Sequence, residues 1–226
     1  MMIKIIAIIP ARGGSKAIPL KNMKKINKKP LIEYSIRNCL ESKIFSKIII
    51  SSDNDNILKY CSKYKNKITI LKRPENISRN NSKTEDTLLH AINTLKLKHN
   101  DIPDYICVLE PTAPLRKTQT IKNLYKFLKK KNIKSLITVS TLDHSPGLIK
   151  KKSFEFINYD RRRRQDRKKI YVETGTFYLV NFKYFLKYKK IVSRSPYPFI
   201  VSKIEATDIN DYEDLEIARK LLYKKN

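Results

Sequence analysis

Two glycines, a serine and three cations follow directly after the most hydrophobic segment of the chain, in the stretch IIAIIPARGGSKAIPLKN. Gly13 and Gly14 permit a positive φ and let backbone N–H groups approach an anion closely. Arg12, Lys16 and Lys21 add positive charge, and a guanidinium can bind two phosphate oxygens at once. The stretch is neither GxGxxG nor the Walker pattern GxxxxGK[ST]. A phosphate-binding loop is the chemistry that it favours, and an ordinary charged turn is the alternative.

No cysteine or histidine cluster accompanies this loop in the sequence. Cys39, Cys61 and Cys107 are far apart, and each lies in an apolar pattern without a CxxC spacing. We expect them to be small core residues rather than metal ligands or nucleophiles. The three histidines are equally scattered, so a zinc site is not expected.

The formal net charge of the chain is +28, from 49 Lys and Arg against 21 Asp and Glu. One interpretation is nucleic-acid binding through phosphate contacts. However, the lysines run along the entire chain together with many Ile and Asn residues, as an A/T-rich genome would encode on any solvated surface. We therefore favour the compositional interpretation and expect no nucleic-acid partner. Such a surface still attracts anionic small molecules.

Alternating apolar runs and helical patterns must position the loop. The expected strands are residues 3–9, 47–51, 68–71, 105–110 and 135–140, and the expected helices are 30–42, 53–64, 83–96 and one that ends near 131. Continuous apolar strands alternating with helices predict an α/β fold with a mostly parallel, Rossmann-like sheet and helices on both faces. The turn after the first strand then lies at the carboxyl edge, where such sheets bind ligands.

The alternation stops between about residues 141 and 169, which are polar and carry only short alternating pieces. We interpret this segment as an arm of a single domain, 1–226, and as a possible dimerisation element. A strand at 170–180, a short helix, a strand at 198–203 and a closing helix follow the arm. The sequence has no apolar run of membrane-spanning length and no signal-peptide pattern, which predicts a cytoplasmic protein.

Seven segments, in order along the whole chain, resemble the acylneuraminate cytidylyltransferases, which are the CMP-sialic acid synthetases and their relatives for legionaminic and pseudaminic acids. The segments are PARGGSKAIPLKN, PLIEYSI, IIISSDNDNI, KRPENIS, LEPTAPLR, RRQD…YVETGTFYLV and TDINDYEDLEIA. The resemblance implies a fold of the nucleotide-diphospho-sugar transferase type, with a protruding arm that builds a homodimer. It also implies a Mg²⁺-dependent reaction that joins CTP to the anomeric hydroxyl of a nine-carbon 2-keto sugar acid and releases pyrophosphate.

The resemblance also implies a nucleotide site in the first half of the chain. Arg12 and Lys21 match the triphosphate clamp and are expected to be catalytic together with Asp208. Asn22 matches the position that reads the cytidine, and Arg73 matches an arginine near the cytosine. The full nucleotide-binding set is Ala11, Arg12, Gly13, Gly14, Ser15, Lys21, Asn22, Arg73, Ser82 and Thr84.

The expected sugar-binding residues are Glu110, Arg164, Gln165 and Tyr178. Arg164 matches the arginine that receives the sugar carboxylate. Glu110 stands where the family commonly has glutamine, so it replaces an amide donor by a carboxylate. That carboxylate would repel an acidic sugar unless it meets hydroxyls or an amine-derived group. The departure leaves the reaction class unchanged and leaves the identity of the sugar open.

The expected metal ligands are Asp208 and Asp211, because Mg²⁺ takes one or two carboxylates together with phosphates and water. The family often has Asp-x-Asp here, whereas Asn210 is the second residue of that pattern in this chain. An N-cap of the closing helix is the ordinary alternative for either aspartate. Glu110 and Asn210, with Ala17 in place of the usual glycine, are the residues that would favour an inactive relative.

Overall fold

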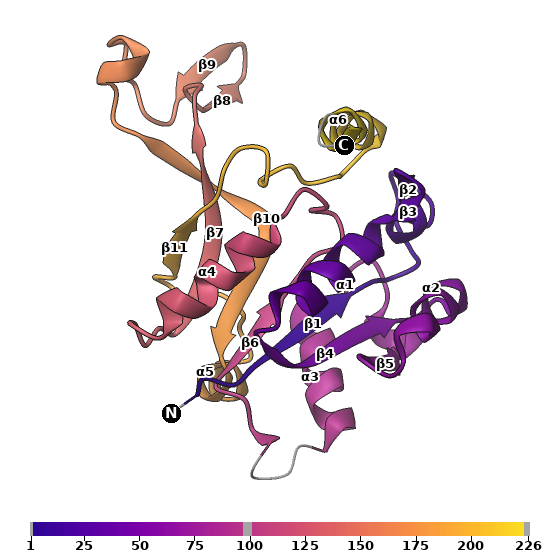
Figure 1. Cartoon of the computed structure of the whole chain (residues 1–226). Coiled ribbons are helices and arrows are strands. Elements are labelled where there is room, and N and C mark those ends of the chain that lie inside the picture. The colour runs from indigo at the N-terminus through magenta and orange to yellow at the C-terminus, as the bar shows by residue number, and fades with distance from the viewer. Residues whose placement is uncertain (1, 97–100, 224–226) are drawn as a thin grey trace.

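The computed structural model describes residues 2–96 and 101–223. Seven strands form one sheet in the order β11-β7-β10-β6-β1-β4-β5 (Figure 1). Their bounds are β1 Ile5–Pro10, β4 Phe45–Ser52, β5 Thr69–Lys72, β6 Tyr105–Val108, β7 Ser135–Leu142, β10 Ile170–Asn181 and β11 Tyr197–Ile200. Only β10 runs antiparallel to its neighbours in this sheet. The predicted α/β fold with a mostly parallel sheet is confirmed.

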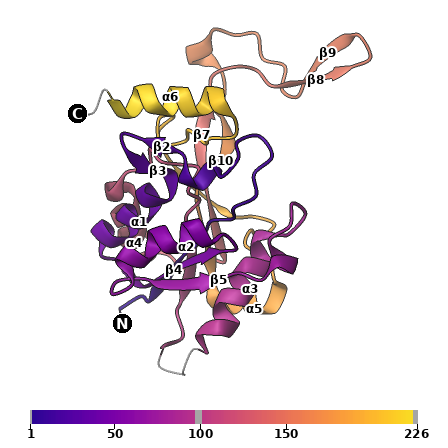
Figure 2. The ribbon, with the colours of Figure 1, turned by 90° about the vertical axis from the view of Figure 1, so that its right-hand side faces the viewer.

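Helices cover both faces of the sheet (Figure 2). Helices α1 (Leu31–Ser42), α2 (Asp55–Cys61) and α4 (Thr118–Leu128) share one hydrophobic cluster, and α3 (Thr84–Leu95) and α5 (Phe182–Tyr188) share the other. Successive residues of β1 point alternately into the two clusters, which is why the strand is apolar at every position. No helix in the described part of the chain is long and apolar enough to span a membrane.

A third, smaller cluster closes the carboxyl edge of the sheet. A short hairpin, β2 (Lys25–Ile26) and β3 (Lys29–Pro30), packs against the closing helix α6 (Tyr212–Tyr223). Asn27 and Lys28 turn the hairpin with positive φ angles of 46° and 64°. The sequence did not predict this hairpin. Its packing brings the segment before α6 next to the loop after β1.

The expected arm projects from the body of the molecule beyond β7 and β10 (Figures 1 and 2). Its tip is a second hairpin, β8 (Gly147–Lys150) paired with β9 (Ser153–Phe156), and a short 3-10 helix over Arg164–Asp166 follows. The arm exposes a group of large apolar side chains: Leu148, Ile149, Phe154, Phe156, Ile157 and Tyr159.

Candidate active site

One cleft runs along the carboxyl ends of the central strands, and its two parts differ in charge. The first part, here called the basic half, is a cavity of about 280 Å³ lined by five cations, Arg12, Lys21, Arg73, Arg79 and Lys83, and by one carboxylate, Glu110. The second part, here called the acidic half, is lined by four carboxylates, Glu85, Glu110, Glu173 and Asp208. No Lys or Arg of the described chain lines the acidic half. Because Thr84, Glu110 and Thr112 line both halves, the two are continuous.

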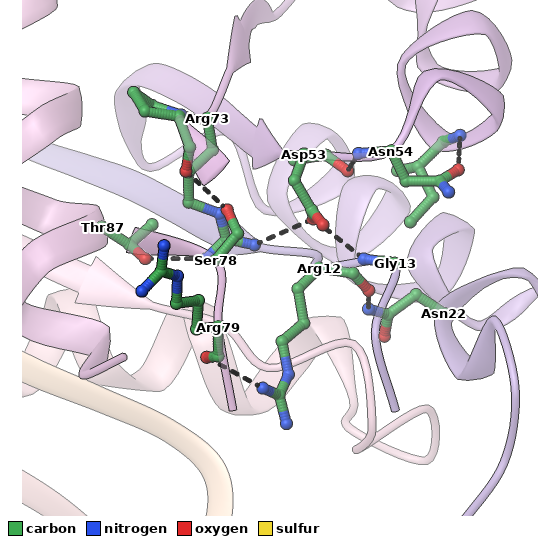
Figure 3. Close-up of polar contacts among 12 residues, drawn as sticks. Arg12, Gly13, Asn22, Asp53, Asn54, Arg73, Ser78, Arg79 and Thr87 are labelled. Carbon is green, nitrogen blue, oxygen red and sulfur yellow. Dashed lines mark hydrogen bonds and ion pairs between the residues drawn. The ribbon is translucent and has the colours of Figure 1, made fainter. Parts of the chain in front are cut away.

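The loop after β1 has a fixed conformation at the start of the cleft. Nη1 of Arg12 donates to the carbonyl of Arg79 at 3.3 Å (Figure 3). The same atom donates to Oδ1 of Asn80, also at 3.3 Å. Nδ2 of Asn22 donates to the carbonyl of Arg12 at 2.9 Å. The backbone N–H of Gly13 donates to Oδ1 of Asp53 at 2.9 Å. The guanidinium of Arg12 therefore spans the cleft between its own loop and the loop after β5.

Neither Gly13 nor Gly14 uses the positive φ that glycine permits. Gly13 is required for a different reason. A Cβ atom at Gly13 would lie 2.7 Å from Cβ of Asn54, which is too close for any side chain. Gly14 has open space around it, lines the basic half and is exposed. Its backbone remains accessible to an anion.

Lys21 joins this loop to the segment before α6. Its Nζ donates to the carbonyl of Ile209 at 2.7 Å, and the side chain is half-buried. Burial lowers the pKa of Lys21, and the nearby Asp208 carboxylate partly opposes that effect. Arg12 also acts on Lys21 electrostatically. Arg12 and Asp208 thus both act electrostatically on the same ammonium group, although they are almost 200 positions apart in the sequence.

Arg73 is the most buried cation of the cleft, with 5% of its surface exposed. Its Nη1 donates to Oγ1 of Thr87 at 2.7 Å, and its Nη2 lies 3.8 Å from Oδ1 of Asp53. Burial lowers the pKa of Arg73, and Asp53 opposes this. Nε and Nη2 have no hydrogen-bond partner among the described residues. A buried guanidinium with unpaired N–H groups is suited to a ligand that brings its own acceptor, such as a base carbonyl or a phosphate.

Glu110 lies where the two halves meet, and it is half-buried. Burial, followed by the charge of Asp208, raises the pKa of Glu110 to about 7. The buried Arg116 fixes the backbone here, since its Nη2 donates to the carbonyl of Glu110 and its Nε to the carbonyl of Thr176, both at 2.7 Å. Arg116 is therefore a structural anchor for the strand end that carries Glu110.

The acidic half contains an unpaired carboxylate oxygen. Oδ1 of Asp208 is buried and has no hydrogen-bond partner among the described residues. Gly175 of β10 leaves room for this carboxylate, because a Cβ there would lie 3.4 Å from Cγ of Asp208. Tyr178 lines the same half, and burial together with Glu173 raises its pKa. An unpaired carboxylate oxygen of this kind suits a hard cation that brings further oxygen ligands with it.

Most of the residues predicted for the nucleotide line the basic half: Arg12, Gly14, Ser15, Lys21, Asn22, Arg73, Ser82 and Thr84. Ala11 is placed differently. Its side chain is fully buried in the core, and its N–H donates to the carbonyl of Ser51 at 2.9 Å. Ala11 therefore supports the loop from beneath the cleft.

The structure places the two predicted metal ligands in different surroundings. Oδ1 of Asp211 accepts from the N–H of Asp214 at 2.9 Å, and Oδ2 of Asp214 accepts in return from the N–H groups of Asp211 and Asn210. This reciprocal pattern is the N-cap of α6. Asp211 is exposed and capped in this way, whereas Asp208 faces the cleft. The described residues contain no cluster of three or more His, Cys, Asp or Glu that could hold a metal alone.

The sugar-binding predictions fall into two separate places. Glu110 and Tyr178 line the acidic half. Gln165 lies on the arm, in a different cavity that His144 and Arg167 also line. Arg164 begins the short 3-10 helix beside it, and its side chain lies outside what the structure describes. Within one chain, the arm residues are not brought to the cleft.

Sequence reasoning missed several residues of the site. Thr87, Thr112, Arg79 and Lys83 line the basic half without having been predicted. Asp53 was quoted within IIISSDNDNI but received no role. Its position one residue after a buried strand, at the carboxyl edge of a parallel sheet, was the available signal.

Known proteins resemble this chain along nearly its whole length. The model of the cytidylyltransferase family matches residues 6–224. The pseudaminic acid cytidylyltransferase of Campylobacter jejuni is 33% identical over 99% of this chain and 97% of its own. The CMP-N,N'-diacetyllegionaminic acid synthase of Legionella pneumophila is 28% identical over 97% of this chain and 96% of its own.

The fold also resembles that of a solved synthetase. The structure of a CMP:2-keto-3-deoxy-manno-octonic acid synthetase complexed with CTP superposes with a TM-score of 0.73, covering 99% of this chain and 100% of its own at 14% identity. At that identity the likeness concerns the fold alone. The family model and the full-length relatives confirm what the seven sequence segments indicated: this chain belongs to the cytidylyltransferase family of the CMP-nonulosonic acid synthetases.

Proposed function

We propose that this protein transfers the cytidylyl group of CTP to the anomeric hydroxyl of a nine-carbon 2-keto sugar acid. The bond between the α-phosphorus and the oxygen that bridges it to the β-phosphorus breaks, and a bond from the sugar oxygen to the α-phosphorus forms. The hydroxyl proton goes to the solvent, and pyrophosphate leaves with the bridging oxygen. The observation that carries the proposal is the continuity of the cleft. It joins a half that suits a triphosphate to a half that suits a metal ion and a hydroxyl-rich sugar.

The chain's own cations stabilise the charge that develops on the phosphoryl oxygens. Arg12 and Lys21 line the basic half from the loop after β1, and Gly14 exposes its backbone beside them. Positively charged donors that are already in position stabilise such charge without reorganisation during the reaction. The unpaired Nε and Nη2 of Arg73 supply donors for an acceptor on the cytosine.

Asp208 would hold Mg²⁺ in the acidic half. The unpaired Oδ1 of Asp208 and the space left by Gly175 fit that role, and the capped Asp211 leaves Asp208 as the principal ligand. When bound, Mg²⁺ neutralises phosphate charge and polarises the phosphoryl group. Its remaining ligands would be phosphate oxygens and water.

The sugar acid would occupy the acidic half, beside Glu110 and Tyr178. Carboxylate oxygens accept hydrogen bonds from hydroxyl and N–H groups, so this half suits a polyhydroxylated, amino-substituted sugar. The relatives named for pseudaminic and legionaminic acids support this sugar class. For the sugar carboxylate itself, the basic partner would be Arg164 with Gln165.

Because Gln165 lies on the arm and lines a cavity of its own, we propose that the arm of a second copy supplies these residues. The exposed apolar side chains of the hairpin β8–β9 support a homodimer. CTP is a cytoplasmic nucleotide, so we expect the enzyme to act in the cytoplasm.

Pyrophosphate release tests the proposed function directly. The protein is incubated with CTP, Mg²⁺ and one sugar acid at a time, from a panel of pseudaminic, legionaminic and sialic acids. A reaction without sugar is the control. We expect pyrophosphate release that depends on one of these sugars, with a CMP-sugar as the second product. Binding of RNA without turnover of any sugar would support a nucleic-acid-binding protein, and inactivity in both assays would identify an inactive relative.

A further inference from the structure

The segment Ser51–Asn54, at the end of β4, holds the strands on both sides of it. The carbonyl of Ser51 accepts from the N–H of Ala11 at 2.9 Å. The carbonyl of Ser52 accepts from the N–H of Arg73 at 2.7 Å. Both bonds lie immediately beyond the ends of β1 and β5. The loop that follows β1 and the loop that follows β5 therefore leave the sheet from one common support.

The Asp53 carboxylate continues this support into the cleft. Its Oδ1 accepts from the N–H of Gly13 at 2.9 Å and lies 3.8 Å from Nη2 of Arg73. Figure 3 shows Asp53 between these two groups. Among the residues that raise the pKa of the buried Arg73, Asp53 has the largest effect and Glu110 the next. A single oxygen thus orients both the loop after β1 and the arginine after β5.

The neighbouring residue makes this arrangement rigid. Oδ1 of Asn54 accepts from the N–H groups of Asn56 and Ile57 and so caps α2. Cβ of Asn54 lies so close to Gly13 that no side chain fits there. Asp53 is therefore held between a capped helix and a loop packed directly on it. Its carboxylate has little freedom to move away from Gly13 and Arg73.

We propose that Asp53 is a positioning residue for the nucleotide, which aligns the phosphate-binding loop with Arg73 so that one CTP molecule contacts both. The inference rests on the proposed function in one respect, namely that this cleft binds CTP. Asp53 itself touches no reacting atom. Its effect is to fix the distance between the donors for the phosphates and the donors for the base before the nucleotide arrives, and such preorganisation strengthens binding.

Two substitutions separate the two contacts of Asp53. Asp53→Asn is isosteric and keeps an oxygen acceptor for Gly13, but it removes the charge beside Arg73. Asp53→Ala removes both contacts. Asp55→Asn is the matched control, because Asp55 is an exposed aspartate two positions away whose partner is Lys72 at the surface.

CTP binding is measured by calorimetry without any sugar, and the KM values for CTP and for the sugar are measured separately. We expect Asp53→Asn to weaken CTP binding by about tenfold, as is typical for the loss of an interaction with a charged group, and Asp53→Ala to weaken it further. The KM for the sugar should stay within about twofold of the parent value, because Asp53 contacts only Gly13 and Arg73 among the described residues of the cleft. A general loss of structure would instead raise both KM values. Asp55→Asn should bind CTP like the parent.

A double-mutant cycle with Arg73→Lys identifies the residue through which Asp53 acts. If Asp53 orients Arg73, the double variant should lose less CTP affinity than the product of the two single losses. Parental CTP affinity in Asp53→Asn would overturn the proposal, and so would an equal rise of both KM values or fully multiplicative losses. If Asp53→Ala does not fold, the isosteric Asp53→Asn decides alone.

The binding assay also keeps this inference separate from the proposed function. A parent protein that binds CTP but uses no sugar of the panel would contradict the proposed reaction while leaving the test of Asp53 in place. A parent protein that does not bind CTP would contradict both.

Discussion

The two halves of the cleft have opposite charge although they share Glu110 and two threonines. Five cations and one carboxylate line the basic half, whereas four carboxylates and no described cation line the acidic half. This contrast occurs in a chain with more than twice as many Lys and Arg as Asp and Glu. The net charge therefore says little about the ligands, because the local arrangement of charge selects them.

The contrast in charge also suits the two halves to different ligands. A triphosphate carries negative charge and needs the cations of the basic half. The acidic half can hold a metal ion and can accept hydrogen bonds from hydroxyl groups. The reacting phosphorus would lie between the halves, near Lys21 and Asp208, which interact electrostatically. Substitutions on the two sides should consequently affect different kinetic constants.

The largest effect is expected from removing a cation of the basic half. Arg12→Ala should lower kcat/KM by about 1,000-fold, because a guanidinium that stabilises developing phosphoryl charge is lost. The fold should be retained, since Arg12 lies in a loop and is half-buried. Steady-state kinetics with circular dichroism checks both expectations. Lys16→Ala is the matched control on the same loop, and near-parental activity of Arg12→Ala would show that Arg12 does not clamp the triphosphate.

The next largest effect is expected in the acidic half. Asp208→Asn should lower kcat on the order of 100-fold and raise the Mg²⁺ concentration needed for half-maximal rate, because a charged metal ligand is lost. A magnesium titration of the rate measures both. Asp211→Asn serves as the control, since asparagine also caps helices well. If Asp211→Asn lowers kcat and raises the Mg²⁺ requirement as much as Asp208→Asn does, both aspartates hold the metal.

A smaller effect is expected at Glu110, which lies in both halves. Glu110→Gln should raise the KM for the sugar by about tenfold, because a charged acceptor for sugar hydroxyl or N–H groups becomes neutral. The KM for CTP should change less. The comparison is made at pH 8 with Glu173→Gln as a more exposed control in the same half. A change in the KM for CTP alone would show that Glu110 contacts the nucleotide and not the sugar.

The smallest effect concerns stability. Since the pKa of Glu110 is raised from 4.5 to about 7, the folded state binds the proton more tightly than the unfolded state. The contribution of Glu110 to the free energy of unfolding is fully present below about pH 4.5 and is lost as the pH rises through about 7. Glu110→Gln should therefore melt about 5 °C higher than the parent at pH 8, with little difference at pH 4.5. Thermal melts across this pH range measure it, and a constant difference would refute the pKa shift.

The sequence predicted the sheet and its helices because apolar strands and amphipathic helices have strong periodic patterns. It could not predict the direction of β10, since an apolar run reads the same in either orientation. The hairpin β2–β3 was missed because strands of two residues have no periodicity. Lys28, which turns the hairpin with a positive φ, is not a typical turn residue.

At the site, the sequence indicated which residues gather but not what each one contacts. The sequence indicated that Gly13 permits a positive φ, whereas the structure uses its lack of a side chain to make room for Asn54. Asp208 and Asp211 are alike in sequence, and they are distinguished only in the structure, where Asp211 caps α6 and Asp208 lines the cleft. Asp53 had no apparent role until the structure placed it between two loops that are 60 positions apart.

The central claim is that one CTP molecule binds with its triphosphate and its base in the basic half. A crystal structure of the protein with CTP and Mg²⁺ tests this most directly. We predict phosphate oxygens at Arg12 and Lys21, the cytosine at Nε or Nη2 of Arg73, and the metal at Asp208. A nucleotide bound in the arm cavity, or with its phosphates away from Arg12 and Lys21, would contradict the account.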